Sequence, residues 1–172
     1  MPDDFSHTVT VAEAAERFLG DTERMTQVIY EDDLKLLAAM GASRRFGDLL
    51  LCGYENQLDE EIQKQFSAVT VKLFDDVSCV VYRGTDKTVV GWREDCNMAF
   101  LSPVPSQRAA VEYLRQAAEQ IPGTFLLCGH SKGGNLAIYA AATCERTLQD
   151  RILKVCSMDG PGSVSYTHLR AH

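Results

Sequence analysis

The chain has 172 residues, of which 45% are hydrophobic and 24% charged, and its formal net charge is -7. This balance fits one globular domain with its own core, so neither disulfides nor a metal are needed to stabilise it. The negative charge repels phosphate and argues against a nucleic-acid partner. No apolar run approaches the roughly 20 residues of a membrane helix, so we expect no integral membrane segment.

The first 44 residues predict a helical segment. Apolar residues follow a helical period from Val11 to Leu19, and a second helix is predicted from Asp32 or Asp33 to Met40. Residues 1–20 carry no basic stretch of the kind that begins a secretory signal, so we expect a cytoplasmic protein with reduced thiols. The six cysteines form no CxxC pair, and no metal or other cofactor is expected.

The middle of the chain predicts a β-hairpin. The apolar run Leu49–Cys52 comes first, and Leu58–Ala68, which mixes charged and apolar residues, is predicted to be helical. The period then changes to two over Val69–Leu73, where apolar and polar residues alternate. A turn at Asp75-Asp76 separates this strand from a second one, Ser78–Tyr82.

From residue 106 onward the predicted order is helix, strand, helix, strand. In the first helix, Ala110, Tyr113, Leu114 and Ala117 share one apolar face at helical spacing. The continuous apolar strand Thr124–Cys128 that follows is of the kind buried on both faces of a parallel sheet. An Ala-rich helix, Asn135–Cys144, and a strand, Ile152–Met158, follow. This βαβ order predicts an α/β domain with a mostly parallel sheet and flanking helices.

The main candidate catalytic motif is Gly129-His130-Ser131-Lys132-Gly133, which matches the G-x-S-x-G pattern of a nucleophile elbow. A serine at the tip of a strand-to-helix turn needs glycine on either side, because other side chains would collide there. The Lys132 amide, at a helix amino terminus, would then face the carbonyl oxygen under attack. The predicted strand before Gly129 and helix after Gly133 are the context that this motif requires. We therefore predict Ser131 as a nucleophile.

Three alternatives to a nucleophile elbow fit this segment less well. A strand-to-helix turn with a capping serine remains open. A phosphate-binding loop is excluded, because that loop needs the order Gly-Lys-Ser or Gly-Lys-Thr, which the segment does not have. His130 is not favoured as the catalytic base, since a residue next to the nucleophile on a turn points away from it.

Several separated motifs together resemble the Mbeg1-like family, bacterial proteins related to the class 3 lipases. The motifs are Gln65–Ala68, Tyr82–Asp86 (YRGTD), Gly91–Asp95 (GWRED), Asn97–Phe100, Gly129–Ala142 (GHSKGGNLAIYAAA) and Asp159–Gly162. The resemblance covers roughly Arg45–Gly162. It implies an α/β-hydrolase fold and cleavage of a small acyl ester or lipid. It also implies oxyanion donors from Thr85 and Lys132.

The residues themselves agree with part of this assignment. Thr85 follows a predicted strand end, and Gly84 beside it allows a close backbone approach. A plain exit turn from the hairpin is the alternative. Arg83 and Asp95 are expected to pair and so hold the loop that carries Thr85, a structural role rather than a catalytic one.

A catalytic triad is harder to complete from this sequence. After Ser131, the order Ser, Asp/Glu, His leaves Asp159 as the candidate acid and His168 and His172 as the later histidines. Only nine residues lead from Asp159 to His168, too few for a crossover to another parallel strand. The alternative to a hydrolase is a non-catalytic hydrolase-fold protein used for binding or regulation, or an inactive fragment.

The end of the chain suggests why the triad is incomplete. In the resembled family, further strands and helices follow Asp159–Gly162. We therefore expect residues 45–162 to form a partial hydrolase domain and 163–172 to be a non-native or disordered tail. The true acid and histidine would belong to a longer native chain. Acyl length and oligomeric state have no signature in the sequence.

Overall fold

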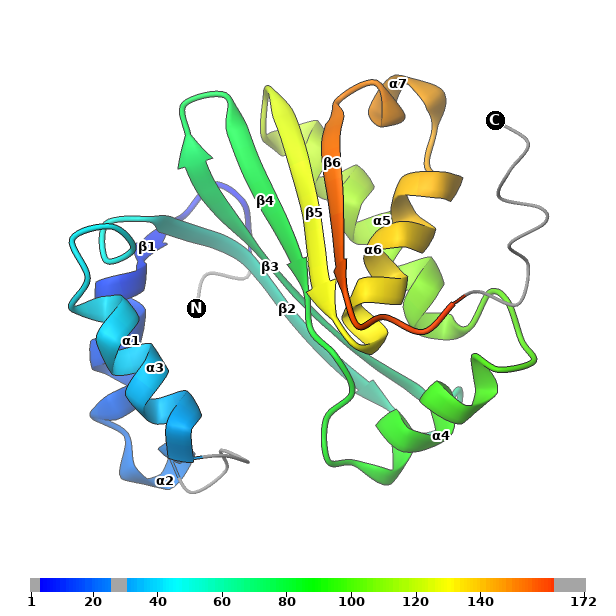
Figure 1. Ribbon diagram of the computed structural model, residues 1–172, viewed down its shortest axis with the longest axis horizontal. Helices are drawn as coiled ribbons and strands as arrows, with labels where there is room; N and C mark the ends of the chain where they lie inside the picture. The colour runs from blue at the N-terminus through cyan, green and yellow to red at the C-terminus, as the bar shows by residue number, and fades with distance from the viewer. Residues whose placement is uncertain (1–3, 26–30, 163–172) are drawn as a thin grey trace.

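The computed structural model describes residues 4–25 and 31–162. Its elements, in chain order, are β1 Val9–Thr10, α1 Val11–Leu19, α2 Thr22–Met25, α3 Glu31–Gly41, β2 Leu50–Asp59, β3 Lys64–Phe74, β4 Val77–Tyr82, α4 Val89–Asn97, α5 Pro105–Gln120, β5 Thr124–His130, α6 Lys132–Thr143, α7 Arg146–Gln149 and β6 Ile152–Met158 (Figure 1). Among these residues, no helix is both long and apolar enough to cross a bilayer.

The strands of the described residues form one sheet in the order β1-β2-β3-β4-β5-β6. The first four strands pair antiparallel, whereas β4, β5 and β6 pair parallel. The α/β class is confirmed, but the prediction of a mostly parallel sheet is wrong. The local hairpins of the first half need only short turns, and helical crossovers build parallel pairs only in the second half.

The predicted helix over residues 58–68 is also wrong, because this segment contains the end of β2 and the start of β3. Gln65 pairs with Leu58, and Ala68 pairs with Glu55. Gln65, Phe66, Ser67 and Ala68 are all buried. Because polar side chains are buried here, the sequence lacks the alternation of apolar and polar residues that would indicate a strand. Pairing with β2 across the sheet outweighs the local helix propensity of this segment.

The core lies between one face of the sheet and helices α5 and α6, which pack side by side on that face (Figure 1). The predicted inner face of α5 is confirmed, since Ala110, Tyr113, Leu114 and Ala117 are at most 1% exposed. Tyr113 anchors the helix to the sheet, because its hydroxyl donates to the Gly53 carbonyl at 2.7 Å and lies 2.9 Å from the Thr70 hydroxyl.

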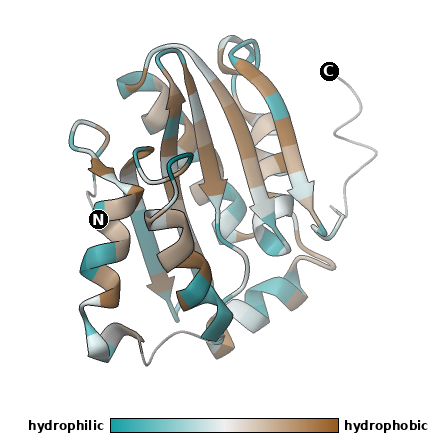
Figure 2. Ribbon diagram, turned by 60° about the vertical axis from the view of Figure 1, so that its left-hand side comes forward, coloured by the Kyte–Doolittle hydropathy of each residue, from teal (hydrophilic) through white to brown (hydrophobic). Residues whose placement is uncertain are grey.

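The opposite face of β4 and β5 is less covered. Both strands alternate between buried residues and half-buried ones, which include Cys79, Val81, Leu126 and Cys128. The central strands carry much of the hydrophobic colouring in Figure 2. The expectation that β5 is buried on both faces is therefore wrong, because α5 and α6 pack on the same side of the sheet.

Candidate functional site

Ser131 lies between β5 and α6 in an unusual backbone conformation, with φ 54° and ψ −128°. A left-handed φ costs a residue with a side chain roughly 1–2 kcal/mol, and such strain clusters at functional sites. The strand ends at His130 and the helix begins at Lys132, three residues before the predicted start. The Ser131 amide donates to the Met158 carbonyl at 2.9 Å, so the turn is also held against the end of β6.

Glycines allow this turn to pack tightly. A β-carbon on Gly129 would lie 2.3 Å from the carbonyl carbon and oxygen of Gly133. One on Gly133 would lie 2.1 Å from the Tyr82 carbonyl oxygen, at the end of β4. Gly84, whose contact with the elbow the sequence did not reveal, would place a β-carbon 3.5 Å from that of Ser131. The loop after β4 therefore lies directly against the serine turn.

Thr85 lies in that loop (Arg83–Asp86), which we call the oxyanion loop after the role that the family resemblance implies for Thr85. Its hydroxyl oxygen is buried and has no hydrogen-bond partner within the described part of the chain. A buried hydroxyl without a partner costs about 1–3 kcal/mol, which a bound polar ligand would remove. Asp86 shapes the loop, because its Oδ1 accepts from the Thr88 amide at 2.9 Å and from the Thr88 hydroxyl at 2.5 Å.

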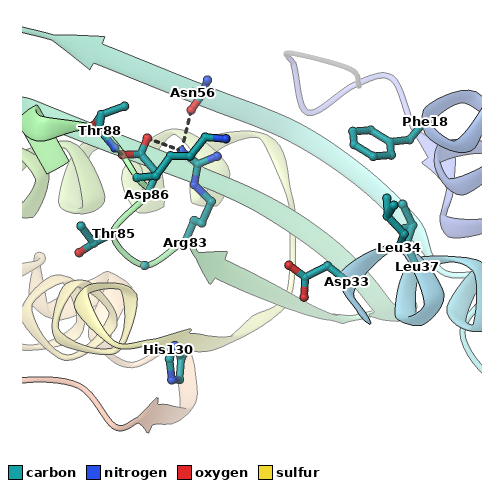
Figure 3. Close-up of a pocket in the computed structure, with 12 residues that line it drawn as sticks. Phe18, Asp33, Leu34, Leu37, Asn56, Arg83, Thr85, Asp86, Thr88 and His130 are labelled. Atoms are coloured by element: carbon teal, nitrogen blue, oxygen red, sulfur yellow. Dashed lines mark hydrogen bonds and ion pairs between the residues drawn. The ribbon is translucent and has the colours of Figure 1, made fainter. Parts of the chain in front are cut away.

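The expected pair between Arg83 and Asp95 is wrong. Arg83 donates to the Asn56 side-chain oxygen at 3.1 Å and lies 3.5 Å from the Asp86 carboxylate (Figure 3). The buried face of α4 carries Val90, Gly91 and Glu94. Helix geometry therefore turns Glu94, rather than Asp95, toward the interior.

The Lys132 side chain is fully buried beneath the elbow. Its ammonium donates to the backbone oxygen of Gln65 at 2.7 Å and to the side-chain oxygen of Gln65 at 2.6 Å. It also lies 3.1 Å from Oε2 of Glu94, and both partners of this ion pair are 0% exposed. Burial lowers the pKa of Lys132, and the Glu94 carboxylate acts in the opposite direction.

Glu94 joins four elements around this ammonium. Its Oε1 accepts from the Ser106 amide of α5 at 2.7 Å, and its Oε2 accepts from the Gln65 amide of β3 at 2.9 Å. The Gln65 side chain in turn accepts from the Asp86 amide at 3.4 Å, which extends the network to the oxyanion loop. Sequence reasoning missed Gln65 and Glu94 as parts of the site. The spacing of Val90, Gly91 and Glu94 is the signal that could have placed Glu94 on a buried helix face.

The end of β6 lies beside the elbow and carries Asp159, the residue after the carbonyl to which Ser131 donates. The following segment is tied to α6, because the Asn135 side chain donates to the Pro161 carbonyl at 3.0 Å. His168 and His172 lie outside the described residues. The part of the chain that is described holds no group of three or more His, Cys, Asp or Glu side chains suited to a metal ion.

A cavity of about 700 Å³ opens beside the oxyanion loop (Figure 3). One wall is polar and the other, contributed by α1 and α3, is mainly apolar. The polar wall consists of Asn56, Arg83, Gly84, Thr85, Asp86, Lys87, Thr88 and His130, and the second wall of Phe18, Asp33, Leu34 and Leu37. Ser131 does not line this cavity, but its neighbours His130 and Gly84 do.

The strain at Ser131 predicts an unusual order of stabilities. Ser131→Ala keeps the β-carbon at positive φ, whereas Ser131→Gly removes it. Removing the β-carbon should relieve roughly 1–2 kcal/mol of backbone strain, and the greater freedom of glycine in the unfolded chain should cost about 0.5–1 kcal/mol. We therefore expect Ser131→Gly to be more stable than Ser131→Ala by about 0.5–1 kcal/mol. Urea unfolding of both variants measures this difference. Equal midpoints would contradict a strained elbow.

Comparison with known proteins identifies one family. The family model described as Mbeg1-like matches residues 40–170, more than half of the chain. The match includes the oxyanion loop, the elbow and the end of β6, and it continues past Gly162. No curated protein and no solved structure gives a significant match.

Proposed function

The chain belongs to the Mbeg1-like family, and on this premise we propose that it is a serine hydrolase that cleaves a carboxylic ester. The observation that carries the proposal is the backbone of Ser131, held at φ 54° between a strand and a helix. A serine that only capped a helix would need no such strain, and the oxyanion loop would have no reason to lie against it.

Two groups are proposed to stabilise the oxyanion that forms when Ser131 attacks. The Lys132 amide is at the amino terminus of α6, where the helix dipole favours negative charge. Thr85 is the second donor, and its unpartnered hydroxyl supports a role in binding a polar group. Loss of one such donor typically lowers kcat by about 10²–10³-fold. The buried Lys132 ammonium positions the elbow and does not itself contact the substrate.

The proton of Ser131 must pass to a base. Asp159 is the proposed acid of a triad. It follows the carboxyl end of β6, next to the carboxyl end of β5, which Ser131 follows. His130 is exposed at the end of β5 and is not proposed as the base. We propose that the base is a histidine outside the described residues, and that Asp159 orients it.

We infer the substrate class from the cavity beside the oxyanion loop. Phe18, Leu34 and Leu37 offer an apolar wall to an acyl chain, and the oxyanion loop offers polar groups to the ester end. This pairing supports a lipid or another amphiphilic acyl ester as substrate. No cofactor is required by this chemistry.

A fluorophosphonate probe tests the proposal, because it forms a covalent adduct only with an activated serine. We expect labelling at Ser131, located by peptide mass spectrometry, and none in Ser131→Ala. Hydrolysis of a short-chain p-nitrophenyl ester should fall in that variant to the residual rate that an oxyanion hole alone sustains.

The matched control is Ser102→Ala, which removes an exposed serine of the loop between α4 and α5 and should leave labelling unchanged. A folded wild-type protein that takes up no probe would contradict the proposal. That result would favour the non-catalytic alternative, a hydrolase-fold protein used for binding.

A further inference from the structure

Two cysteines meet on the less covered face of the sheet. Cys79 lies in β4 and Cys128 in the neighbouring parallel strand β5. In the register of these strands Cys79 is opposite Leu126 and Cys128 is opposite Val81, so the two cysteines are diagonal neighbours on one face. Their sulfur atoms are 3.4 Å apart, and both residues are half-buried free thiols.

We propose that Cys79 and Cys128 form a redox-responsive thiol pair, which a peroxide closes to a disulfide between β4 and β5. This modification site is independent of the proposed hydrolase activity. Sulfur atoms already in contact need to move by only about 1.4 Å to reach the bond length of about 2.05 Å. Because diagonal neighbours in a sheet have α-carbons about 7–8 Å apart, closing the bond also draws β4 and β5 slightly together.

The contact between the sulfurs also assigns their roles. The hydrogen bond between the two thiols lowers the pKa of Cys128, although burial opposes that shift. The same hydrogen bond, together with burial, raises the pKa of Cys79. Since the thiolate is the reactive form, Cys128 is the sulfur that attacks the oxidant and Cys79 is the resolving thiol.

The chemistry proceeds in two balanced steps. The Cys128 thiolate attacks one oxygen of hydrogen peroxide, the O–O bond breaks, and a sulfenic acid and hydroxide result. Cys79 then loses its proton and attacks the Cys128 sulfur, which forms the S–S bond and breaks the S–O bond. The departing hydroxide takes up that proton as water. Overall, two thiols lose two electrons, and one peroxide is reduced to two waters.

The other cysteines are poorer candidates for this reaction. Burial raises the pKa of both Cys52 and Cys144 and so disfavours their thiolates. Cys96 is exposed on α4, outside the strands that hold the pair. Cys156 is the residue of β6 in register with Cys128, and it is therefore the alternative partner that an experiment must exclude.

Peptide mapping of the full chain after treatment with hydrogen peroxide tests the proposal. We expect the intact mass to fall by two hydrogens and the cross-linked peptides to contain Cys79 and Cys128. Cys79→Ser and Cys128→Ser should each abolish this cross-link, whereas Cys96→Ser and Cys156→Ser should keep it. A cross-link of Cys128 to Cys156, or no intramolecular cross-link at all, would overturn the assignment.

The pH dependence of alkylation by iodoacetamide gives a second measurement that does not require a disulfide to form. Cys128 in the wild type should react with a midpoint below that of an ordinary thiol, at about 8.5. Cys79→Ala removes the hydrogen-bond donor and should move this midpoint upward, whereas Cys79→Ser keeps a hydroxyl donor and should move it less. An unchanged midpoint in Cys79→Ala would show that the contact does not activate Cys128.

Discussion

Replacing Lys132 with methionine is expected to lower the free energy of unfolding by about 3–5 kcal/mol, the usual cost of leaving a buried charge without its partner. Glu94 is 0% exposed and would keep its carboxylate in the interior with no cation beside it. The two Gln65 oxygens would also lose the ammonium that donates to them. Urea unfolding at pH 7 measures the change through the transition midpoint.

Two control variants distinguish the cost of an unpaired buried charge from the cost of losing an exposed ion pair. Lys132→Met combined with Glu94→Gln leaves no buried charge and should recover much of the lost stability. Arg115→Met breaks exposed ion pairs to Glu112 and Glu119 and should cost at most about 1 kcal/mol. If Lys132→Met were no worse than Arg115→Met, the buried network would not support the elbow as described.

The single variant Glu94→Gln adds a pH signature to the same prediction. Without the carboxylate, the pKa of Lys132 in the folded protein falls further below its ordinary value. At alkaline pH the unfolded chain then binds more protons than the folded one, so stability rises with pH. We expect Glu94→Gln to recover part of its deficit between pH 7 and about pH 10, where the unfolded lysine also loses its proton.

Replacing Gly133 with alanine is expected to destabilise the protein by about 3 kcal/mol, the upper part of the range for overpacking. The new β-carbon would lie 2.1 Å from the Tyr82 carbonyl oxygen and 3.0 Å from the Arg83 carbonyl carbon. Both are backbone atoms, so no side-chain rotation can relieve the clash. The helix would have to move away from β4, which would also separate Ser131 from the oxyanion loop.

The sign of this effect is informative, because alanine normally stabilises a helix by about 1 kcal/mol relative to glycine. Gly20 provides the matched control, since its φ of −79° suits alanine and a β-carbon there would come no nearer than 3.2 Å to another residue. Gly20→Ala should be neutral or slightly stabilising. A Gly133→Ala protein as stable as the wild type would contradict the close packing of the elbow on β4.

Local patterns explain which elements could be predicted. The inner face of α5 repeats Ala110, Tyr113, Leu114 and Ala117 at helical spacing, and the structure buries all four. The hairpin of β3 and β4 was recognisable because its turn lies at Asp75-Asp76 between apolar strands. In both cases the interactions that decide the structure are close in sequence, so the pattern contains them.

The segment Gln65–Ala68 shows where local patterns fail. Its polar residues are buried through hydrogen bonds to distant partners, such as that of the Gln65 amide to Glu94, 29 residues later. No window of sequence around Gln65 contains that carboxylate. The predicted pair of Arg83 and Asp95 failed for a related reason, since the direction of each side chain depends on where α4 begins and on what it packs against.

Local sequence is enough to place a serine between an apolar strand and a helix, with glycines where the turn leaves no room for side chains. Steric exclusion at Gly129 and Gly133 acts over a few residues, so the G-x-S-x-G pattern alone is enough to indicate it. The contacts around that serine and elsewhere in the sheet depend on long-range packing. This packing placed Gly84 against Ser131, turned the Lys132 ammonium inward to Glu94, and brought Cys79 into contact with Cys128. These contacts join strands and helices far apart in the chain, and their geometry is set by sheet pairing and helix packing, which no single stretch of sequence contains.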